Sequence, residues 1–241
     1  FSPASGKPVT TPSQDITLGS YYLCYENKRR KAKFLAQAPQ DQPWFNDYFE
    51  VLRSLDGGHL HLHDFINLRN PYYQQDALWS RDVKNNKFIV TTPGRCIFHE
   101  VWPPSMGFHN STVGKKELSR MIKDCYENID RETLIGVLDA LKDIGYKYAT
   151  IAGFSIGIQD IIVPKNKAEL IAQAKAEVRK HHEQFRIGAI TENERYSKCI
   201  DTWTQVNVEL AESLAVALES NDGREEINPI WAMLDSGARG S

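Results

Sequence analysis

The sequence predicts an α+β protein in which a mixed region of strands and helices is followed by a long antiparallel helical hairpin. Three patterns indicate this fold class. Polar and apolar residues alternate over 59–69, apolar residues recur at helical spacing over 118–141, and a heptad pattern runs through 165–220. The chain has 241 residues, 41% of them hydrophobic, which is enough to bury one sizeable core or two modest ones.

Charge and cysteine content argue against several classes of protein. Lys and Arg number 29 against 31 Asp and Glu, so the net charge of −2 does not predict a domain that binds nucleic acid by itself. The cysteines form no CxxC pair, which argues against a zinc site or a disulfide framework and predicts reduced thiols in the cytoplasm. They are Cys24, Cys96, Cys125 and Cys199.

The hydropathy and the ends of the chain also allow predictions. The sequence has no run of about 18 apolar residues and no secretory signal, so we expect a soluble protein without a membrane partner. It starts at Phe1 without Met and stops in a Gly-rich stretch at Ser241. We expect both ends to be cuts in a longer polypeptide.

The first part of the chain is predicted to contain short elements. Residues 15–25 form either a strand or a short helix, and the basic run at 28–33 is expected to be a solvated surface. An aromatic cluster at 44–49 predicts a short helix that ends at Gly57-Gly58.

The middle of the chain is predicted to be mostly β. The stretch HLHLHDFINLR at 59–69 alternates at period two, as a half-buried strand does. The stretch KFIVTTPGRCIFHEVWP at 87–103 predicts two more strands around a turn at Pro93-Gly94.

Two amphipathic helices are predicted after Gly114. The first has its apolar stripe at Leu118, Met121, Ile122, Cys125 and Tyr126. Asp130 is the expected N-cap of the second helix and Gly145 its expected C′ residue, and residues 146–164 are then predicted to be strand and loop. The stripe of the second helix is Leu134, Val137, Leu138 and Leu141.

The hairpin over 165–220 is the most regular element. Its turn contains Gly188, and Thr191 with Glu194 predicts a capping box at the start of the second arm. A first arm of about 22 residues reaches roughly 33 Å. The expected seam is Ile171, Ala174, Val178, His181 and Phe185 on the first arm, and Tyr196, Ile200, Trp203, Asn207, Leu210, Leu214 and Ala217 on the second.

Two stretches have a functional and a structural interpretation. One stretch contains His59, His61 and His63 with Asp64 beside them, and the three histidines would share one face of a strand. They would either hold a metal or form the polar face of a surface strand, and we favour the surface strand. Gly6-Lys7 resembles a phosphate loop only in placing Gly before Lys, because the rest of that motif is missing.

Two charged surfaces are also open to both interpretations. Lys115 and Lys116 stand in the first turn of a helix, where they are an exposed basic pair or face a ligand that carries phosphate. Residues near the hairpin tip form a solvated face or a docking surface. The residues alone contain no catalytic triad, paired catalytic carboxylates or dinucleotide loop, and they indicate a binding or structural module.

Five motifs in order resemble the β′ subunit of bacterial DNA-directed RNA polymerase. They are SPASGKPVTTPSQDITLG at 2–19, TVGKKELSRMI at 112–122, GYKYATIAGFSIGIQDIIVP at 145–164, ERYSKCIDTW at 194–203 and NPIWAMLDSGARGS at 228–241. The resemblance implies a pore domain at 1–161 and a funnel domain at 162–241, with the hairpin as the rim helices of the secondary channel. It is weakest over 26–90.

The resemblance also implies partners and an activity. The expected partners are the α, β and ω subunits, the rest of β′, transcript-cleavage factors of the Gre type, and nucleoside triphosphates with the RNA 3′ end. The family forms phosphodiester bonds with Mg²⁺, but the aspartate triad that binds this metal has no counterpart here. We therefore expect this segment to be inactive alone and to bind no cofactor or metal.

Site residues follow from the same resemblance. Gln14, Asp15, Lys115, Lys116 and Arg239 are expected near the pore and the catalytic chamber. The expected docking surface for factors is Arg186, Ile187, Tyr196, Ser197 and Asp201.

The chain departs from the family pattern at three positions. Gln159 replaces a common acidic residue, and Ser197 replaces an Asn. Glu132 stands where some relatives that bind a guanosine tetraphosphate alarmone beside ω have Lys, which argues against alarmone binding. The alternatives are a free-standing adaptor with a projecting hairpin and, third, a metal-dependent hydrolase built on His59, His61 and His63.

Overall fold

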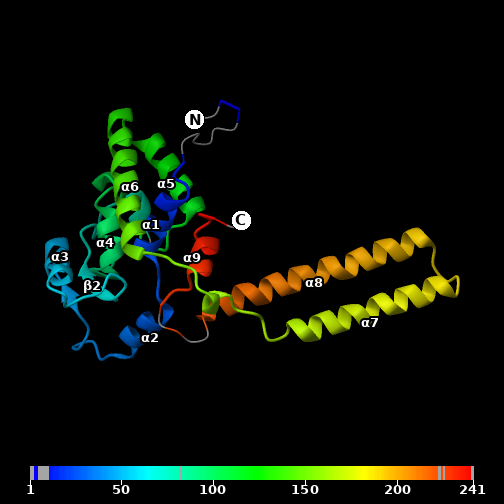
Figure 1. Cartoon of the computed structure of the whole chain (residues 1–241). Helices are drawn as coiled ribbons and strands as arrows, with labels where there is room; N and C mark the ends of the chain where they lie inside the picture. The colour runs from blue at the N-terminus through cyan, green and yellow to red at the C-terminus, as the bar shows by residue number, and fades with distance from the viewer. Residues whose placement is uncertain (1–2, 5–10, 82, 222–223, 225, 240–241) are drawn as a thin grey trace. The chain divides into compact units, whose positions relative to one another are not determined.

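The computed structural model describes residues 3–4, 11–81, 83–221, 224 and 226–239 (Figure 1). The chain divides into two compact units, one of Phe1–Ser155 with Ala232–Ser241 and one of Ile156–Trp231. Helices predominate in both, and the first unit also contains a small three-stranded sheet. The predicted α+β class with a helical hairpin is confirmed.

Two helices in direct backbone contact form the centre of the first unit. Helix α1 (Asp15–Cys24) packs along α6 (Arg131–Ala152). The helices cross at Gly19 and Gly145, where a Cβ atom on Gly19 would lie 1.9 Å from the Gly145 carbonyl oxygen. Only glycine permits this approach.

The prediction that Gly145 ends a helix is therefore wrong. Asp130 caps α6 as predicted, because its side chain accepts a hydrogen bond from the Thr133 N–H. The helix then runs past Gly145 to Ala152, and Gly153 is the left-handed residue that follows it, with φ of 55°. Gly145 serves the helix crossing rather than the helix end.

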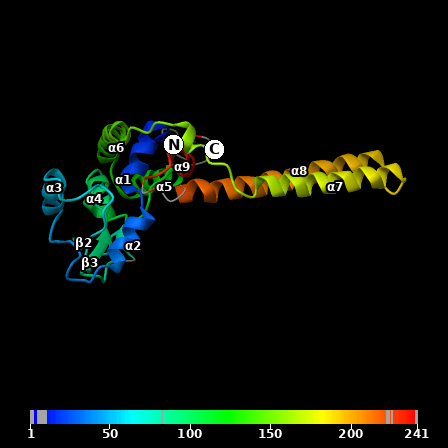
Figure 2. The ribbon, with the colours of Figure 1, turned by 60° about the horizontal axis from the view of Figure 1, so that its bottom comes forward.

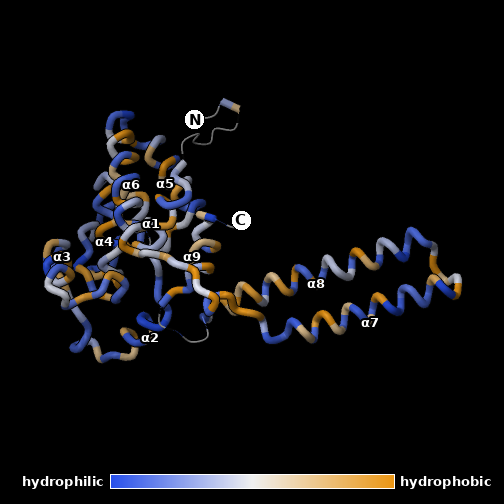
Figure 3. Tube along the Cα trace, in the orientation of Figure 1, coloured by the Kyte–Doolittle hydropathy of each residue, from blue (hydrophilic) through white to orange (hydrophobic). Residues whose placement is uncertain are grey.

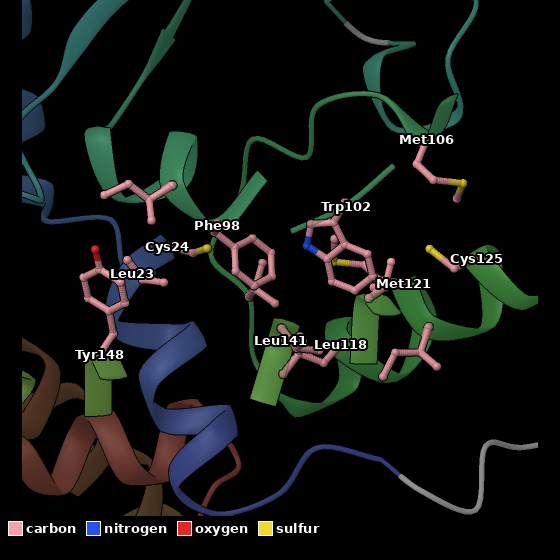
Figure 4. Close-up of a cluster of buried hydrophobic side chains, with 14 of the residues drawn as sticks. Leu23, Cys24, Phe98, Trp102, Met106, Leu118, Met121, Cys125, Leu141 and Tyr148 are labelled. Carbon is pink, nitrogen blue, oxygen red and sulfur yellow. The ribbon is translucent and has the colours of Figure 1, made fainter. Parts of the chain in front are cut away.

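A hydrophobic core fills the space among α4 (Pro93–His99), α5 (Lys115–Asn128) and α6. Figure 4 shows its side chains, which also include Leu23 and Cys24 of α1 and Trp102 after α4. Phe98 and Trp102 pack edge to face with ring centroids 5.7 Å apart, and Trp79 packs on Trp102 at 5.2 Å. The predicted stripes of the two amphipathic helices contribute Leu118, Met121, Ile122, Cys125, Leu134, Val137 and Leu141. Tyr126 is the exception, since its side chain is 52% exposed.

The sheet has the order β1-β2-β3 and consists of β1 (Trp44–Phe45), β2 (Ile66–Arg69) and β3 (Phe88–Thr91). β1 pairs with β2 in parallel, with Trp44 opposite Asn67. β2 pairs with β3 in antiparallel fashion, with Leu68 opposite Ile89.

The prediction that the middle of the chain is mostly β is wrong. Residues 59–65 form bends and a turn, so only the end of the alternating stretch is a strand. The stretch after β3 forms α4, because the Thr92 side chain accepts a hydrogen bond from the Arg95 N–H and Pro93 fits the first helical position.

The remaining short elements of this unit are helical. Residues predicted as strand or helix form α1, and the basic run forms α2 (Lys28–Ala36), which Asn27 caps. The helix predicted at the aromatic cluster is confirmed in its second half as α3 (Tyr48–Asp56), with Asp47 as its N-cap, whereas Trp44 and Phe45 form β1. The described residues of the unit also form the 3-10 helices η1 (Leu78–Ser80) and η2 (Pro104–Met106).

A buried guanidinium connects several of these segments. The Arg95 side chain is 3% exposed and donates hydrogen bonds to the Cys24 carbonyl at 3.2 Å, the Asn110 side chain at 3.2 Å and Glu26 at 3.3 Å. Burial raises the pKa of Glu26, but the hydrogen bonds and charges of Lys31 and Arg95 outweigh it and lower that pKa. Arg95 thus fixes the positions of α1 and α4.

The second unit contains the hairpin, formed by α7 (Lys167–Arg186) and α8 (Glu192–Ser220). Figures 1 and 2 show the two helices side by side. The predicted hairpin, its turn with Gly188 at φ 76° and its capping box at Thr191 and Glu194 are confirmed.

The base of the second unit is helical and irregular. It contains η3 (Ile158–Asp160) and the start of α9 (Pro229–Asp235). The strand predicted within 146–164 is wrong, because residues 146–152 belong to α6 and residues 158–160 to η3. The buried Asn228 amide donates to the Asp160 carbonyl at 3.0 Å, and its oxygen accepts from the Ile230 N–H.

The contact between the arms follows the prediction on most of α7 and on part of α8. Ala174 is 3% exposed, but the Phe185 side chain is 42% exposed. On α8 the predicted residues Tyr196, Ile200 and Trp203 are 61%, 46% and 41% exposed, and Asn207 is exposed as well. Closer to the base, Leu210 and Ala217 are half-buried as predicted, whereas toward the tip Cys199, Thr202 and Val206 are half-buried instead.

The reason for this error is that α8 carries apolar residues on more than one face. Figure 3 shows hydrophobic residues along both arms of the hairpin. Spacing alone does not select the face that meets α7. None of the described helices is long and apolar enough to cross a lipid bilayer.

Candidate functional sites

The first site is a basic ridge, formed by Lys115, Lys116 and Arg239 in the first unit. Gly114 caps α5, so both lysines stand in its first turn, as predicted, and both are exposed. The Lys115 N–H donates to the Ser236 carbonyl at 2.9 Å. A Cβ atom on Gly237 would lie 3.3 Å from the Lys115 Cβ, two residues before Arg239.

This geometry brings Lys115 together with the segment that carries Arg239. Because α5 begins there, the positive end of its dipole and the two exposed lysine side chains give a positively charged surface beside this segment, with Glu117 as the acidic residue of the same turn. Such a surface attracts phosphate groups. The contact with residues 236–239 had no signal in the sequence, because it joins segments that are far apart in the chain.

Gln14 and Asp15 stand at the start of α1. Both are exposed, and Gln14 has φ of 49°, a conformation that is uncommon for a residue other than glycine. The α1 helix also reaches the C-terminal segment, since the Tyr21 hydroxyl donates to Asp235 at 2.6 Å. Gln14 and Asp15 thus stand at the start of α1, whereas Lys115 and Lys116 stand at the start of α5. The two places are connected because α1 bonds Asp235 and Lys115 bonds the next residue, Ser236.

The second site is the hairpin tip, which consists of Arg186, Ile187, Tyr196, Ser197 and Asp201. Arg186 ends α7, and Ile187 follows it with 74% of its side chain exposed. The other three lie in the first turns of α8 and are exposed. The structure thus gathers all five near one turn.

The tip has a fixed backbone and two different faces. Ser197 and Asp201 are four residues apart and share a polar face of α8. Tyr196 with Ile200 and Trp203 forms an adjacent apolar face, of which only Tyr196 was predicted to belong to a binding surface. Arg195 lies over the Phe185 ring at 5.7 Å and connects the two arms behind the tip.

The histidine cluster does not form a metal site. His59 and His61 are exposed, whereas the His63 ring nitrogen lies 2.6 Å from the Tyr22 carbonyl. Asp64 accepts hydrogen bonds from the His61 N–H and from Arg30, with which it also forms an ion pair. The turn at 62–63 replaces the expected strand, so the three rings do not share its face.

The described residues outside this cluster offer no metal site either. They contain no group of three or more His, Cys, Asp or Glu that is suited to a metal ion. The Gly6-Lys7 pair lies outside the described residues.

Comparison with known proteins gives one family. Residues 1–161 match the family model described as RNA polymerase Rpb1, domain 3. The whole chain is 46% identical to the DNA-directed RNA polymerase subunit beta' of Methylacidiphilum infernorum over 241 residues, which is 17% of that protein. The corresponding subunits of Opitutus terrae and Heliobacterium modesticaldum are 39% and 36% identical, and the chain spans 17% and 20% of their lengths.

These matches agree with the family that the ordered motifs resemble. The family model covers well over half of the chain, and the relatives align with all of it. The chain therefore belongs to the RNA polymerase Rpb1 domain 3 family.

Proposed function

We propose that this chain works in DNA-templated transcription as part of a DNA-directed RNA polymerase β′ subunit. In this proposal residues 1–161 form the pore domain and residues 162–241 the funnel domain. Together they shape the secondary channel, through which nucleoside triphosphates enter and the backtracked RNA 3′ end leaves. Family membership and the match of the whole chain to a part of β′ subunits support this role.

The observation that carries the proposal is the exposed tip of a long, well-capped hairpin. The arms contain 20 and 29 helical residues, and their tip presents the isoleucine and tyrosine side chains of Ile187 and Tyr196 to solvent beside Asp201. An apolar face next to a polar one is suited to binding a protein. Transcript-cleavage factors of the Gre type are the proposed partners.

The basic ridge is the proposed contact for phosphate groups. Lys115, Lys116 and Arg239 are exposed, and Gly237, two residues before Arg239, lies against Lys115. In this proposal they attract the phosphates of an incoming nucleotide or of backtracked RNA. Gln14 and Asp15 are proposed to lie near the catalytic chamber.

The chemistry of nucleotidyl transfer is proposed to come from outside this chain. Two-metal catalysis with Mg²⁺ requires a cluster of carboxylates, which the described residues do not provide. We expect the chain to be inactive alone and to function in the cytoplasm with the α, β and ω subunits and the rest of β′.

The experiment uses an RNA polymerase whose β′ subunit carries this chain, stalled in a backtracked complex. Tyr196→Ala and Asp201→Asn are expected to reduce RNA cleavage stimulated by a Gre-type factor by about tenfold each, the effect of losing one strong contact. RNA synthesis without the factor should not change.

The control variant is Val216→Ala, whose side chain is 67% exposed on α8, about 30 Å along the helix from Tyr196. It should leave factor-stimulated cleavage unchanged. Equal stimulation of the wild-type enzyme and both tip variants would contradict the docking site. Loss of synthesis without the factor would instead assign the tip to the catalytic cycle.

A further inference from the structure

A cavity of about 640 Å³ lies in the first unit, away from both sites described above. It is open to solvent and is lined by α3, the end of β2 and the segment from α4 to η2. Its walls are mainly apolar and aromatic: Tyr48, Phe49, Leu68, Trp102, Pro104 and Phe108. This volume and this lining are typical of pockets that bind small molecules.

Charged groups of both signs line the same cavity. Arg69 is exposed, and its guanidinium makes no ion pair or hydrogen bond with any residue that the structure describes. Glu100 accepts the Tyr48 hydroxyl at 2.5 Å through Oε2, and Asp47 accepts the Glu50 N–H through Oδ1. Each carboxylate therefore keeps one oxygen for another partner.

Two further residues of the lining carry buried nitrogen atoms without a hydrogen-bond partner. They are the Nε1 of Trp102, a residue that is 3% exposed, and the Nδ1 of His99. The other ring nitrogen of His99 bonds the Tyr72 hydroxyl at 2.8 Å. Unpartnered buried polar groups are unusual in proteins.

We propose that this cavity binds a small aromatic zwitterion of the amino-acid type. The ring would pack between Phe49 and Phe108, the carboxylate would pair with Arg69, and the ammonium group would pair with Glu100 and Asp47. An apolar ligand would leave these charges without partners. A ligand with a single charge would meet at least one group of its own sign, because both signs line the cavity.

The test uses the 241-residue chain and isothermal titration with L-phenylalanine and L-tryptophan. Two analogues each lack one charge: phenethylamine has no carboxylate, and 3-phenylpropionate has no ammonium group. Each is expected to bind about tenfold more weakly than the amino acids, since each loses one charge-assisted hydrogen bond. Amide chemical shifts should move at the residues that line the cavity.

Variants test the assigned pairs. Arg69→Met and Glu100→Gln should each weaken amino-acid binding by about tenfold. Arg81→Met is the matched control, because Arg81 is also exposed and unpaired among the described residues but lines a different cavity. It should bind as the wild type does, and thermal unfolding should show all three variants folded.

Three results would overturn the proposal. One is a folded wild-type chain that shows neither heat of binding nor shift changes with either amino acid. Another is binding of phenethylamine or 3-phenylpropionate as strong as that of phenylalanine. The last is an affinity of Arg69→Met equal to that of Arg81→Met.

Discussion

Gly19 of α1 and Gly145 of α6 face each other across a helix crossing with no room for a side chain. A Cβ atom on Gly19 would lie 1.9 Å from the Gly145 carbonyl oxygen and 2.8 Å from the Ala149 nitrogen. Both partner atoms belong to a helix backbone, which cannot move aside locally. The crossing determines how α1 lies on α6, and with it the place of Asp15 at the start of α1.

Gly19→Ala is expected to destabilise the chain by about 3 kcal/mol or more, because the added methyl group forces the two helices apart. Equilibrium unfolding in urea measures this change. Gly136→Ala is the matched control, since Gly136 is exposed within α6 and has nothing within 4 Å of an added Cβ atom. It should stabilise the chain by about 0.5–1 kcal/mol. Similar changes in stability for Gly19→Ala and Gly136→Ala would contradict the close approach of the helices at Gly19.

Arg95→Met is expected to destabilise the first unit by about 3 kcal/mol, because it leaves the Cys24 carbonyl and the Asn110 side chain without their donor in a buried site. The pKa of Glu26 should rise toward its usual value. Urea unfolding and NMR titration of the carboxyl carbon give the two readouts. Arg81→Met, which removes an exposed arginine, should change stability by less than about 0.5 kcal/mol. If Arg95→Met also changed stability by less than about 0.5 kcal/mol, Arg95 would not hold α1 and α4 together.

Stability is expected to fall below about pH 6.5 because of His99. Burial, and to a lesser extent the charge of His109, lowers the pKa of His99 to about 4. The unfolded chain takes up this proton near pH 6.5 and the folded chain only near pH 4. The contribution of neutral His99 to the free energy of unfolding is thus complete above pH 6.5. It is lost as the pH falls to 4, at about 1.4 kcal/mol per pH unit.

His99→Gln isolates this effect from the other groups that titrate in the same range, including His63 and His109, whose pKa values burial also lowers. The measurement is the free energy of unfolding at several pH values for both proteins. The difference between them should grow smaller as the pH falls from 6.5 to 4. A difference that is constant with pH would assign the acid sensitivity to other residues.

Thr191→Ala is expected to loosen the hairpin tip by about 1 kcal/mol, because it removes the hydrogen bond from the Glu194 N–H to the Thr191 hydroxyl. Hydrogen exchange of amides in the first turn of α8 should become faster. Thr204→Ala changes the same residue type at an exposed position within α8 and should leave exchange at the tip unchanged. Unchanged exchange in Thr191→Ala would show that the turn alone holds the tip.

The double variant Lys115→Gln with Lys116→Gln is tested in a polymerase that carries this chain. We expect the nucleotide concentration for half-maximal RNA synthesis to rise several-fold, because two cations are lost from the basic ridge. The effect should shrink as the salt concentration increases. Lys123→Gln, an exposed lysine later in α5, is the control. Equal behaviour of the double variant and the control would remove the basic ridge from the substrate path.

Local signals in the sequence determined the elements whose ends depend on neighbouring residues. Asp130 caps α6, Thr191 and Glu194 form the capping box of α8, and Gly188 takes positive φ in the turn. Each of these depends on hydrogen bonds or backbone conformation within a few residues. The positions of Lys115 and Lys116 in the first turn of α5, and of the predicted docking residues near the hairpin turn, follow from the same elements.

Family membership was also within reach of the sequence, because five motifs in a fixed order are far more specific than any one of them. The candidate sites were only partly predictable. The contact of Lys115 with Ser236 joins residues far apart in the chain, and the cavity beside Arg69 is assembled from three separate segments. No local pattern reports such contacts.

Tertiary packing decided the rest, for a common physical reason. Gly145 looks like a helix end, yet it lies inside α6 because α1 needs a surface without side chains. Apolar residues occupy several faces of α8, and only the position of α7 selects the face with Thr202 over the face with Trp203. Spacing along the chain shows which side chains can share a face, whereas burial of that face depends on the partner that packs against it.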